Sequence, residues 1–376
     1  MFRTLAATPQ RHLARQARRY ATQEATESKT NERPRVIFSG IQPTGVLHLG
    51  NYLGAISNWV KLQNEAPPQD DIIFSVVGWH ALTMPQNPKE LSASRRDMLA
   101  TLLAFGIDHK RSTLFYQEDN QCHAELSWIL SCITPVQQLK RMTTWKSKLV
   151  TQRNANDESE VDESMLNAGL FTYPILQAAD ILAYRATHVP VGEDQTQHLE
   201  LSRDLAESFN RTFAGKKRFL PIPTQMITPC RRVLSLRDPS AKMSKSAPSL
   251  ASRILLTDTE SQIRNKFRSA VTDSIQYITY DPANRPGTSN LLNILAACTN
   301  ETVEEVARRY SSKNHSDLKA DVGEAVENML KQPRAEFHRL REDKDYLAVV
   351  AKEGAEKAKE RSSRTMTGVR KLVGLY

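Results

Sequence analysis

Short apolar runs alternate with helical stretches along the first third of the chain. Runs at residues 35–39, 71–77 and 112–116 have the length and composition of buried strands. Between them, apolar residues recur at helical spacing over residues 49–60 and 91–105, so each segment is expected to bury one face of a helix. Strands that alternate with helices of this length predict βαβ units and a parallel sheet.

The same pattern continues to about residue 254 and then changes. A helix is predicted over residues 170–184, a strand over 187–191 and a further helix over 195–209. Beyond residue 255 the strand signals fade and helical periodicity takes over. The predicted fold class is therefore α/β, with a Rossmann-like parallel sheet domain over residues 35–254 and a helical C-terminal domain over residues 255–376.

The first 23 residues differ in composition from the rest of the chain. They carry five arginines and no carboxylate, and the first acid is Glu24. An Arg-rich, acid-free start without a continuous apolar stretch is typical of a mitochondrial transit peptide rather than of a secretory signal. We expect residues 1–20 to be this peptide, with cleavage after Tyr20, and the polar residues 21–34 to be a linker. A basic arm that binds RNA is the alternative.

The rest of the basic excess is concentrated near the C-terminus. The net charge is +9, and residues 327–376 hold 12 Lys or Arg against 8 Asp or Glu. Such a surplus suits a polyanionic partner, although a solvated helical face explains it equally well. No apolar run approaches the ~20 residues of a membrane span, so we expect no membrane contact. The four cysteines form no Cys-x-x-Cys pair, which predicts neither a disulfide framework nor a structural zinc site.

A glycine-rich segment follows the first predicted strand and leads into the first predicted helix. Residues 40–51 are Gly-Ile-Gln-Pro-Thr-Gly-Val-Leu-His-Leu-Gly-Asn. They lie at the carboxyl edge of the predicted sheet, where open α/β sheets bind ligands, and the free N–H groups of a helix N-terminus favour phosphate. Gly50 would leave room for a flat base, and His48 and Asn51 could donate hydrogen bonds to anionic oxygens. A structural loop that caps a helix is the alternative.

A basic segment about 190 residues further along is the second candidate. Residues 242–246 are Lys-Met-Ser-Lys-Ser, and they follow Arg237-Asp238-Pro239. Two lysines three residues apart on a loop can stabilise negative charge that develops during phosphoryl chemistry. Alone, such a pentapeptide is more often a solvated loop, but together with the first segment it predicts a nucleotide site.

Both segments resemble signatures of one enzyme class. Residues 48–51 resemble the His-Ile-Gly-His signature of class I aminoacyl-tRNA synthetases, and residues 242–246 are identical to the KMSKS loop of that class. The resemblance runs from about Arg35 to Tyr376. Three further stretches are similar to the tryptophanyl branch of the class: residues 39–45, 189–195 and 270–274.

The resemblance implies an ATP site with its catalytic groups. His48 would face the phosphates, Val233 the adenine, and Lys242 and Lys245 would clamp the departing pyrophosphate. With Ser244, the histidine and the two lysines form the catalytic set. The residues that the resemblance assigns to ATP are Gln42, Pro43, Thr44, Gly50, Asn51, the phosphate-binding Lys148, the ribose-binding Gly192, Glu193 and Asp194, and Val233, Lys242, Met243, Ser244, Lys245 and Ser246.

The resemblance also implies a tryptophan site. Asp180 would select tryptophan, because indole has a single N–H donor that a carboxylate can accept. Tyr173, Gln177 and Asp180 share one face if they belong to one helix, and the first two would bind the substrate's ammonium and carboxylate. A structural ion pair is the alternative for Asp180, and plain packing for the aromatic residues. The indole pocket would be lined by Phe38, Val77 and His80.

The activity implied by the resemblance is that of a tryptophan–tRNA ligase in the mitochondrial matrix. Tryptophan would be activated with ATP, which carries Mg²⁺, and then transferred to mitochondrial tRNA(Trp); no protein-bound metal is expected. The family is homodimeric, and its helical C-terminal domain binds the anticodon. A tyrosyl ligase of the same fold and a catalytically inactive RNA-binding descendant are the alternatives.

Three features of the chain depart from the family pattern. Asn51 replaces the second histidine of the class signature, as is common in the tryptophanyl branch. Ala247 follows the lysine-containing loop where the family has Asp, which removes a cap and a counter-charge. Residues 151–164 are polar, acidic and longer than the family needs, which predicts a surface insertion near the lysines.

Overall fold

The computed structural model divides the chain into two units, Met1–Pro34 and Arg35–Tyr376. The described residues are 34–43, 45–142, 145–146, 166–192, 195–215, 217–227, 232–245 and 247–376. Several predictions therefore lie outside them: the presequence 1–20, nearly all of the linker, the insertion 151–164, and the site residues Thr44, Lys148, Glu193, Asp194 and Ser246. The second unit contains all the elements described below.

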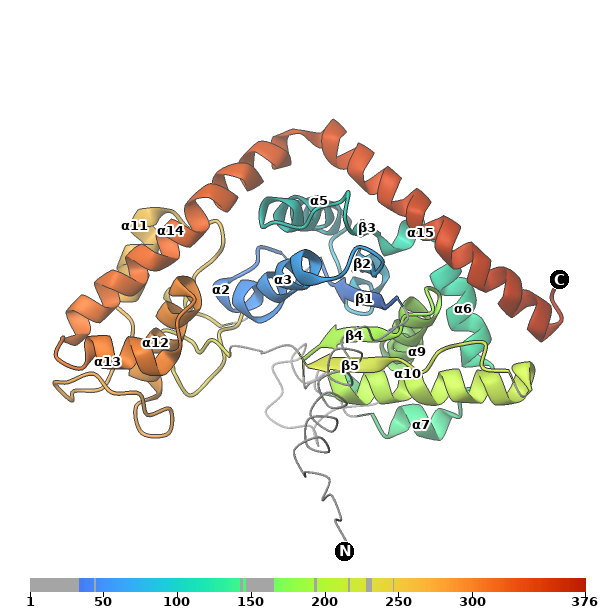
Figure 1. Ribbon diagram of the computed structural model, residues 1–376, viewed down its shortest axis with the longest axis horizontal. Helices are drawn as coiled ribbons and strands as arrows, with labels where there is room; N and C mark the ends of the chain where they lie inside the picture. The colour runs from blue at the N-terminus through green and yellow to red at the C-terminus, as the bar shows by residue number, and fades with distance from the viewer. Residues whose placement is uncertain are drawn as a thin grey trace, which may run out of the picture. The chain divides into compact units, whose positions relative to one another are not determined.

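The second unit is built on a five-stranded parallel sheet with the strand order β3-β2-β1-β4-β5 (Figure 1). This arrangement confirms the predicted α/β class, and the first four strands fall where the apolar runs predict them. The fifth strand was not predicted. The strands are β1 Val36–Ile41, β2 Asp71–Val76, β3 Thr113–Tyr116, β4 His188–Val191 and β5 Thr224–Ile227.

Successive residues of the central strands enter two separate apolar cores. Ile37 and Ile72 belong to the core beneath α3 and α5, whereas Phe38 and Ile73 belong to the core beneath α6, α9 and α10. Both faces of the sheet are therefore buried, which is why its strands are continuous apolar runs rather than alternating ones. The helices of this part are α2 Leu49–Asn51, η1 Tyr52–Ile56, α3 Ser57–Glu65, α4 Gly78–Ala81, α5 Pro88–Ala104, η2 Gln117–Asp119, α6 Cys122–Ser131, α7 Val136–Lys140, α9 Ala168–Leu182, α10 Thr196–Phe209 and η6 Asn210–Ala214.

Helices follow from residue 250 to the end of the chain. The last of them, α15, returns to the sheet and packs on β3, where a β-carbon at Gly354 would collide with the Leu114 carbonyl oxygen. The predicted boundary at residue 254 stays a prediction, but the final helix contacts the sheet rather than α11–α13. These helices are η7 Leu250–Ser252, α11 Glu260–Arg268, α12 Pro286–Thr299, α13 Val303–Tyr310, α14 His315–Glu342 and α15 Lys344–Val373.

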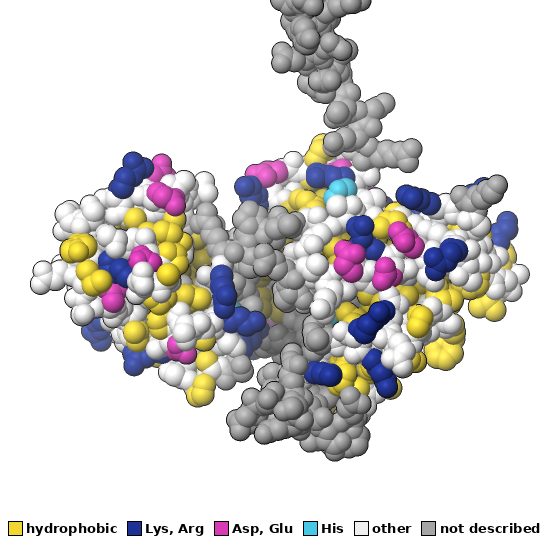
Figure 2. Space-filling model, turned by 90° about the horizontal axis from the view of Figure 1, so that it is seen from below, with side chains coloured by type: hydrophobic (Ala, Val, Ile, Leu, Met, Phe, Trp, Pro, Cys, Tyr) yellow, Lys and Arg dark blue, Asp and Glu magenta, His cyan; other side chains and the backbone are white. Residues whose placement is uncertain are grey.

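The described surface carries charges of both signs. In Figure 2, Lys and Arg side chains lie among Asp and Glu side chains, with apolar patches between them. None of the helices in the described ranges is both long and apolar enough to cross a bilayer.

Candidate active site

The first motif connects the end of β1 to the start of α2. His48 is the N-cap of α2: its Nδ1 accepts from the Asn51 backbone N–H at 3.2 Å, and Asn51 Oδ1 accepts from the His48 N–H at 3.1 Å. Burial, followed by the positive charges of Lys245 and Arg253, lowers the pKa of His48 to about 4. The ring is therefore neutral at pH 7, and its remaining proton lies on Nε2, which can donate.

Gly50 lies in a narrow space between His48 and Val233. A β-carbon at this position would lie 3.1 Å from the His48 ring and 3.6 Å from the Val233 Cβ. His48 and Val233 therefore lie on either side of Gly50, although they are far apart in the chain. The family resemblance assigns both residues to the same nucleotide. The surface they form lacks a projecting side chain at Gly50, as a flat base requires.

The lysine loop comprises residues 242–246, and its described part, residues 242–245, lies against the first motif. Lys242 forms a β-bridge with Leu234, and the Met243 N–H donates to the Val233 carbonyl at 2.9 Å. The Lys245 ammonium donates to the Gly45 carbonyl at 3.3 Å. Burial lowers the pKa of Lys245 to about 8. Both predicted motifs therefore belong to one site.

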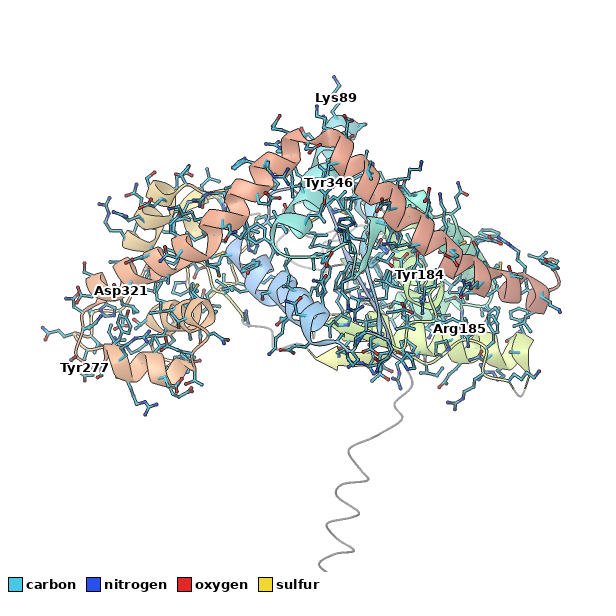
Figure 3. All side chains as sticks on the ribbon, turned by 45° about the horizontal axis from the view of Figure 1, so that its top comes forward. Lys89, Tyr184, Arg185, Tyr277, Asp321 and Tyr346 are labelled. Carbon is cyan, nitrogen blue, oxygen red and sulfur yellow. The ribbon has the colours of Figure 1, made fainter. Side chains whose placement is uncertain are left out.

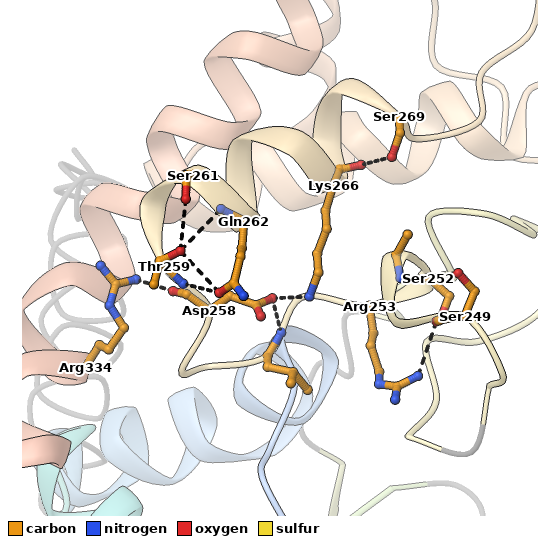
Figure 4. Close-up of polar contacts among 12 residues, drawn as sticks. Ser249, Ser252, Arg253, Asp258, Thr259, Ser261, Gln262, Lys266, Ser269 and Arg334 are labelled. Atoms are coloured by element: carbon orange, nitrogen blue, oxygen red, sulfur yellow. Dashed lines mark hydrogen bonds and ion pairs between the residues drawn. The ribbon is translucent and has the colours of Figure 1, made fainter.

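Residues that follow the lysine loop form a set of polar contacts with one another (Figure 4). Arg253 donates to the carbonyls of Ala247 and Ser249 at 2.8 and 3.3 Å, so the segment after the lysines is held without the missing aspartate. Asp258 accepts from the Leu255 N–H at 2.8 Å, and Leu255 forms a β-bridge with His48.

The six residues predicted to bind tryptophan line a single cavity of about 700 Å³ at the carboxyl ends of β1 and β4. The cavity is also lined by Gln42 of the first motif and Lys242 of the lysine loop, so it is continuous with the nucleotide side. The predicted residues that line it are Phe38, Val77, His80, Tyr173, Gln177 and Asp180.

Asp180 is only 2% exposed and accepts three hydrogen bonds. His80 Nε2 lies 2.7 Å from Oδ2, while His123 Nδ1 and Gln117 Nε2 lie 2.6 and 2.7 Å from Oδ1. Burial alone would raise the pKa of Asp180, but the His80 ring and the hydrogen bonds from His123 and His80 outweigh it and lower the pKa to about 2. The carboxylate is thus ionised and able only to accept.

Comparison with known proteins decides the family. A family model described as "tRNA synthetases class I (W and Y)" matches residues 29–331. The chain is 44% identical over 345 residues to the mitochondrial tryptophan–tRNA ligase of Schizosaccharomyces pombe, across 90% of this chain and 95% of that relative. The chain belongs to the tryptophanyl branch of the class I tRNA synthetases. It is an ATP-dependent tryptophan–tRNA ligase, and the tyrosyl alternative is wrong.

Bacterial synthetases are similar to this one to nearly the same degree. The tryptophan–tRNA ligase of Rickettsia conorii is 41% identical over 341 residues, which cover 90% of this chain and 98% of that relative. The crystal structure of tryptophanyl-tRNA synthetase from Campylobacter jejuni, complexed with ADP and tryptophan, superposes with a TM-score of 0.74 at 30% identity. The superposition covers 91% of this chain and 100% of that one.

The synthetase also has cavity residues that the sequence did not single out. Gln195 and His198 lie at the start of α10: His198 Nε2 is 2.8 Å from the Tyr173 hydroxyl, and Gln195 Oε1 accepts from Gln177 at 3.3 Å. Gln195 ends the stretch 189–195 that resembles the family, so that resemblance could have pointed to it. Gln117 and His123 contact Asp180 only through the tertiary fold. The other unpredicted lining residues are Ser39, Gly40, Met84, Ile181, Val189 and Val191.

Proposed function

We propose that this synthetase charges mitochondrial tRNA(Trp) in two steps at the cavity described above. The observation that carries the proposal is that Asp180 and Lys242 line the same cavity. An amino acid whose side chain lies against Asp180 would present its carboxylate to phosphates held by the lysine loop. Bringing these groups together is the main contribution that a protein makes to such a reaction.

The first motif and the lysine loop would hold ATP, with Mg²⁺ entering on its phosphates. Adenine would lie against Gly50 and Val233, and His48 would donate from Nε2 to a phosphate oxygen. Lys242 and Lys245 would stabilise the charge that develops on pyrophosphate as it leaves. Ribose binding by Gly192, Glu193 and Asp194, and phosphate binding by Lys148, complete the proposed ATP site.

Tryptophan would bind with its indole N–H toward Asp180 and its α-carboxylate toward the lysine loop. A carboxylate oxygen attacks the α-phosphorus of ATP, and the bond from that phosphorus to the pyrophosphate oxygen breaks. Tyr173 and Gln177 would hold the amino and carboxylate groups during this step. The product is tryptophanyl-adenylate.

A terminal ribose hydroxyl of the tRNA would then attack the adenylate carbonyl and release AMP.

The acid-free, Arg-rich residues 1–20 support a mitochondrial destination more strongly than sequence similarity does, because bacterial relatives are about as similar as mitochondrial ones. The helical residues 255–376 would bind the anticodon. Exposed apolar side chains on α6 and α7, Trp128 and Val136, support a homodimer by offering a face for a second copy.

The variant Asp180→Asn tests the proposed substrate. It keeps the size of the side chain but replaces an acceptor-only carboxylate with an amide. A hydrogen bond to a charged group contributes ~1.5–3 kcal/mol, so kcat/KM for tryptophan should fall at least about tenfold. An analogue with sulfur in place of the indole N–H should lose much less, and the KM for ATP should be retained.

Tryptophan-dependent pyrophosphate exchange, run with both substrates on wild type and variant, measures these changes. Equal losses for tryptophan and the sulfur analogue would show that Asp180 is structural. In that case another residue selects the indole.

A further inference from the structure

The two oxygens of the Asp180 carboxylate are not equivalent. Oδ1 accepts from both His123 and Gln117, at 2.6 and 2.7 Å, and a carboxylate oxygen has two lone pairs to offer. Within the described ranges, Oδ2 is bonded to His80 alone, at 2.7 Å. His80 lines the cavity, whereas neither partner of Oδ1 does. One acceptor site therefore remains on Oδ2, the oxygen whose partner faces the cavity.

His123 is itself held from the side away from the carboxylate. Its Nε2 lies 2.7 Å from the Tyr184 hydroxyl, and both side chains are almost completely buried. Because an ionised carboxylate only accepts, His123 Nδ1 must donate to it, and Nε2 is left to pair with the Tyr184 hydroxyl. Burial raises the pKa of Tyr184 well above its usual range, so this hydroxyl keeps its proton.

The hydrogen-bonded chain continues from Tyr184 to the last helix. Asn120 Nδ2 donates to the Tyr184 hydroxyl at 2.8 Å and to the Ser362 hydroxyl of α15 at 2.9 Å. Asn120 and Ser362 are both buried. Figure 3 labels Tyr184, which lies near α15 in that view. A continuous polar chain thus runs from the cavity carboxylate to α15, and each link fixes the orientation of the next.

Gln117 holds the carboxylate from a second direction. Its Oε1 accepts from the Trp79 N–H of α4 at 3.1 Å, while its Nε2 donates to Asp180. Reversing this amide would place oxygen against carboxylate and NH₂ against N–H, so its orientation is fixed. The helix α4 also carries His80. Gln117 therefore fixes the distance between the His80 ring and the Asp180 carboxylate, which meet at Oδ2.

We propose that His123, together with Gln117, is a positioning residue for tryptophan selection. By filling Oδ1 of Asp180, the two side chains leave Oδ2 as the acceptor for the indole N–H. The inference rests on the proposed function of Asp180. His123 touches no substrate; it acts by preventing the carboxylate from rotating away from the indole.

The test compares two substitutions of His123 in the full chain. His123→Phe removes both ring nitrogens, whereas His123→Asn keeps an N–H donor close to the position of Nδ1. Pyrophosphate exchange would give kcat/KM for tryptophan and for the sulfur analogue that lacks the N–H. We expect His123→Phe to lower the tryptophan-to-analogue ratio of kcat/KM about tenfold, the effect of one hydrogen bond to a charged group.

Three further measurements separate positioning from a general loss of structure. His123→Asn should recover most of the ratio, and the KM for ATP should stay unchanged in both variants. Asn210→Ala is the matched control, since it removes a buried hydrogen-bonding side chain that does not line the cavity; it should lower the melting temperature and leave the ratio intact. If His123→Phe does not fold, Tyr184→Phe, which removes one hydroxyl, should lower the ratio in the same direction.

The outcomes distinguish this inference from the proposed function. If Asp180→Asn selectively impairs tryptophan but the His123 and Tyr184 variants leave the ratio unchanged, positioning by His123 is refuted and the role of Asp180 stands. Equal losses for both substrates in the His123 variants also refute it. If Asp180→Asn affects both substrates equally, both proposals fail.

Discussion

His48 uses its two ring nitrogens for different purposes. Nδ1 caps α2 by accepting from Asn51, and this bond leaves the proton of the neutral ring on Nε2. With a pKa of about 4, lowered by burial and by nearby cations, the ring keeps this state throughout the physiological range. The structural and the chemical interpretation of the first motif are therefore compatible, because they need different atoms. Asn51 stands where the class signature has a second histidine. Its Oδ1 accepts the hydrogen bond from the His48 N–H and so helps to cap α2.

The partly buried ammonium of Lys245 predicts an alkaline limit to catalysis. Its pKa is lowered to about 8, so the charge is present below that pH and is lost as the pH rises through it. If this charge stabilises departing pyrophosphate, kcat/KM for ATP at saturating tryptophan should fall above about pH 8, because that parameter reports ionisations of the tryptophan-bound enzyme before ATP binds. His48 ionises too low to contribute. The measurement is a pH profile of pyrophosphate exchange between pH 6 and 10.

Two substitutions of Lys245 serve as controls for that profile. Arginine stays charged over the whole range, so Lys245→Arg should remove the alkaline limb even if its plateau is lower. Lys245→Ala should reduce kcat by ~10²–10³-fold with little change in the KM for tryptophan, as expected for an interaction made in the transition state. An alkaline limb that persists in the arginine variant would assign it to another group.

At the level of elements, the sequence predicts what local pattern encodes. Apolar runs locate β1 to β4, because a sheet buried on both faces needs them. The strand β5, Thr224–Ile227, is short and contains two polar residues in four, so it carries no such signal. The apolar face of α15 shows that one side is buried but not what covers it, and its packing on β3 is therefore unpredictable from the sequence.

In the site, too, the sequence predicts the residues that share one element but not the contacts made between elements. Tyr173, Gln177 and Asp180 follow from helical spacing, because α9 places them on one face. Gln117 and His123 reach Asp180 across more than fifty residues of chain, and no periodicity connects them. Such partners are found only when the elements that carry them, η2 and α6, are assembled with α9.

One helix of the C-terminal part holds the strand-like segment that pairs with the lysine loop. Asn290 of α12 accepts from the Leu234 N–H at 2.8 Å and donates to the Leu234 carbonyl at 3.1 Å. Asn290→Ala would leave both partly buried backbone groups without this partner, at a cost toward the lower end of ~1–3 kcal/mol. Because Leu234 bridges Lys242, we expect a lower melting temperature together with a reduced kcat for adenylate formation. The control is Asn328→Ala, an exposed change on α14, which should alter neither the melting temperature nor kcat. An Asn290 variant with unchanged kcat would show that the lysine loop does not depend on α12.

At the scale of the whole molecule, the catalytic site and the proposed mitochondrial address occupy different parts of the chain. Every site residue that the structure describes belongs to the unit Arg35–Tyr376. Residues 1–20, which precede it, supply five positive charges and none of the predicted binding groups. An Arg-rich, acid-free transit peptide is recognised by its composition rather than by a fold, so we expect that it can be removed without changing the site.

Deleting residues 1–20 should therefore abolish import into mitochondria and leave the enzyme intact. The chain that begins at Ala21 is expected to match the full chain in melting temperature and in tRNA charging, because it retains every strand and helix of the described unit. In cells, the protein recovered from mitochondria should have an N-terminal sequence that begins near Ala21. Replacing the five arginines with glutamine in the full chain provides the matched control, since it keeps the length and removes the charge; it should block import as the deletion does. A mature protein that retains Met1–Tyr20, or a deletion that impairs charging, would show that this segment works as an RNA-binding arm instead.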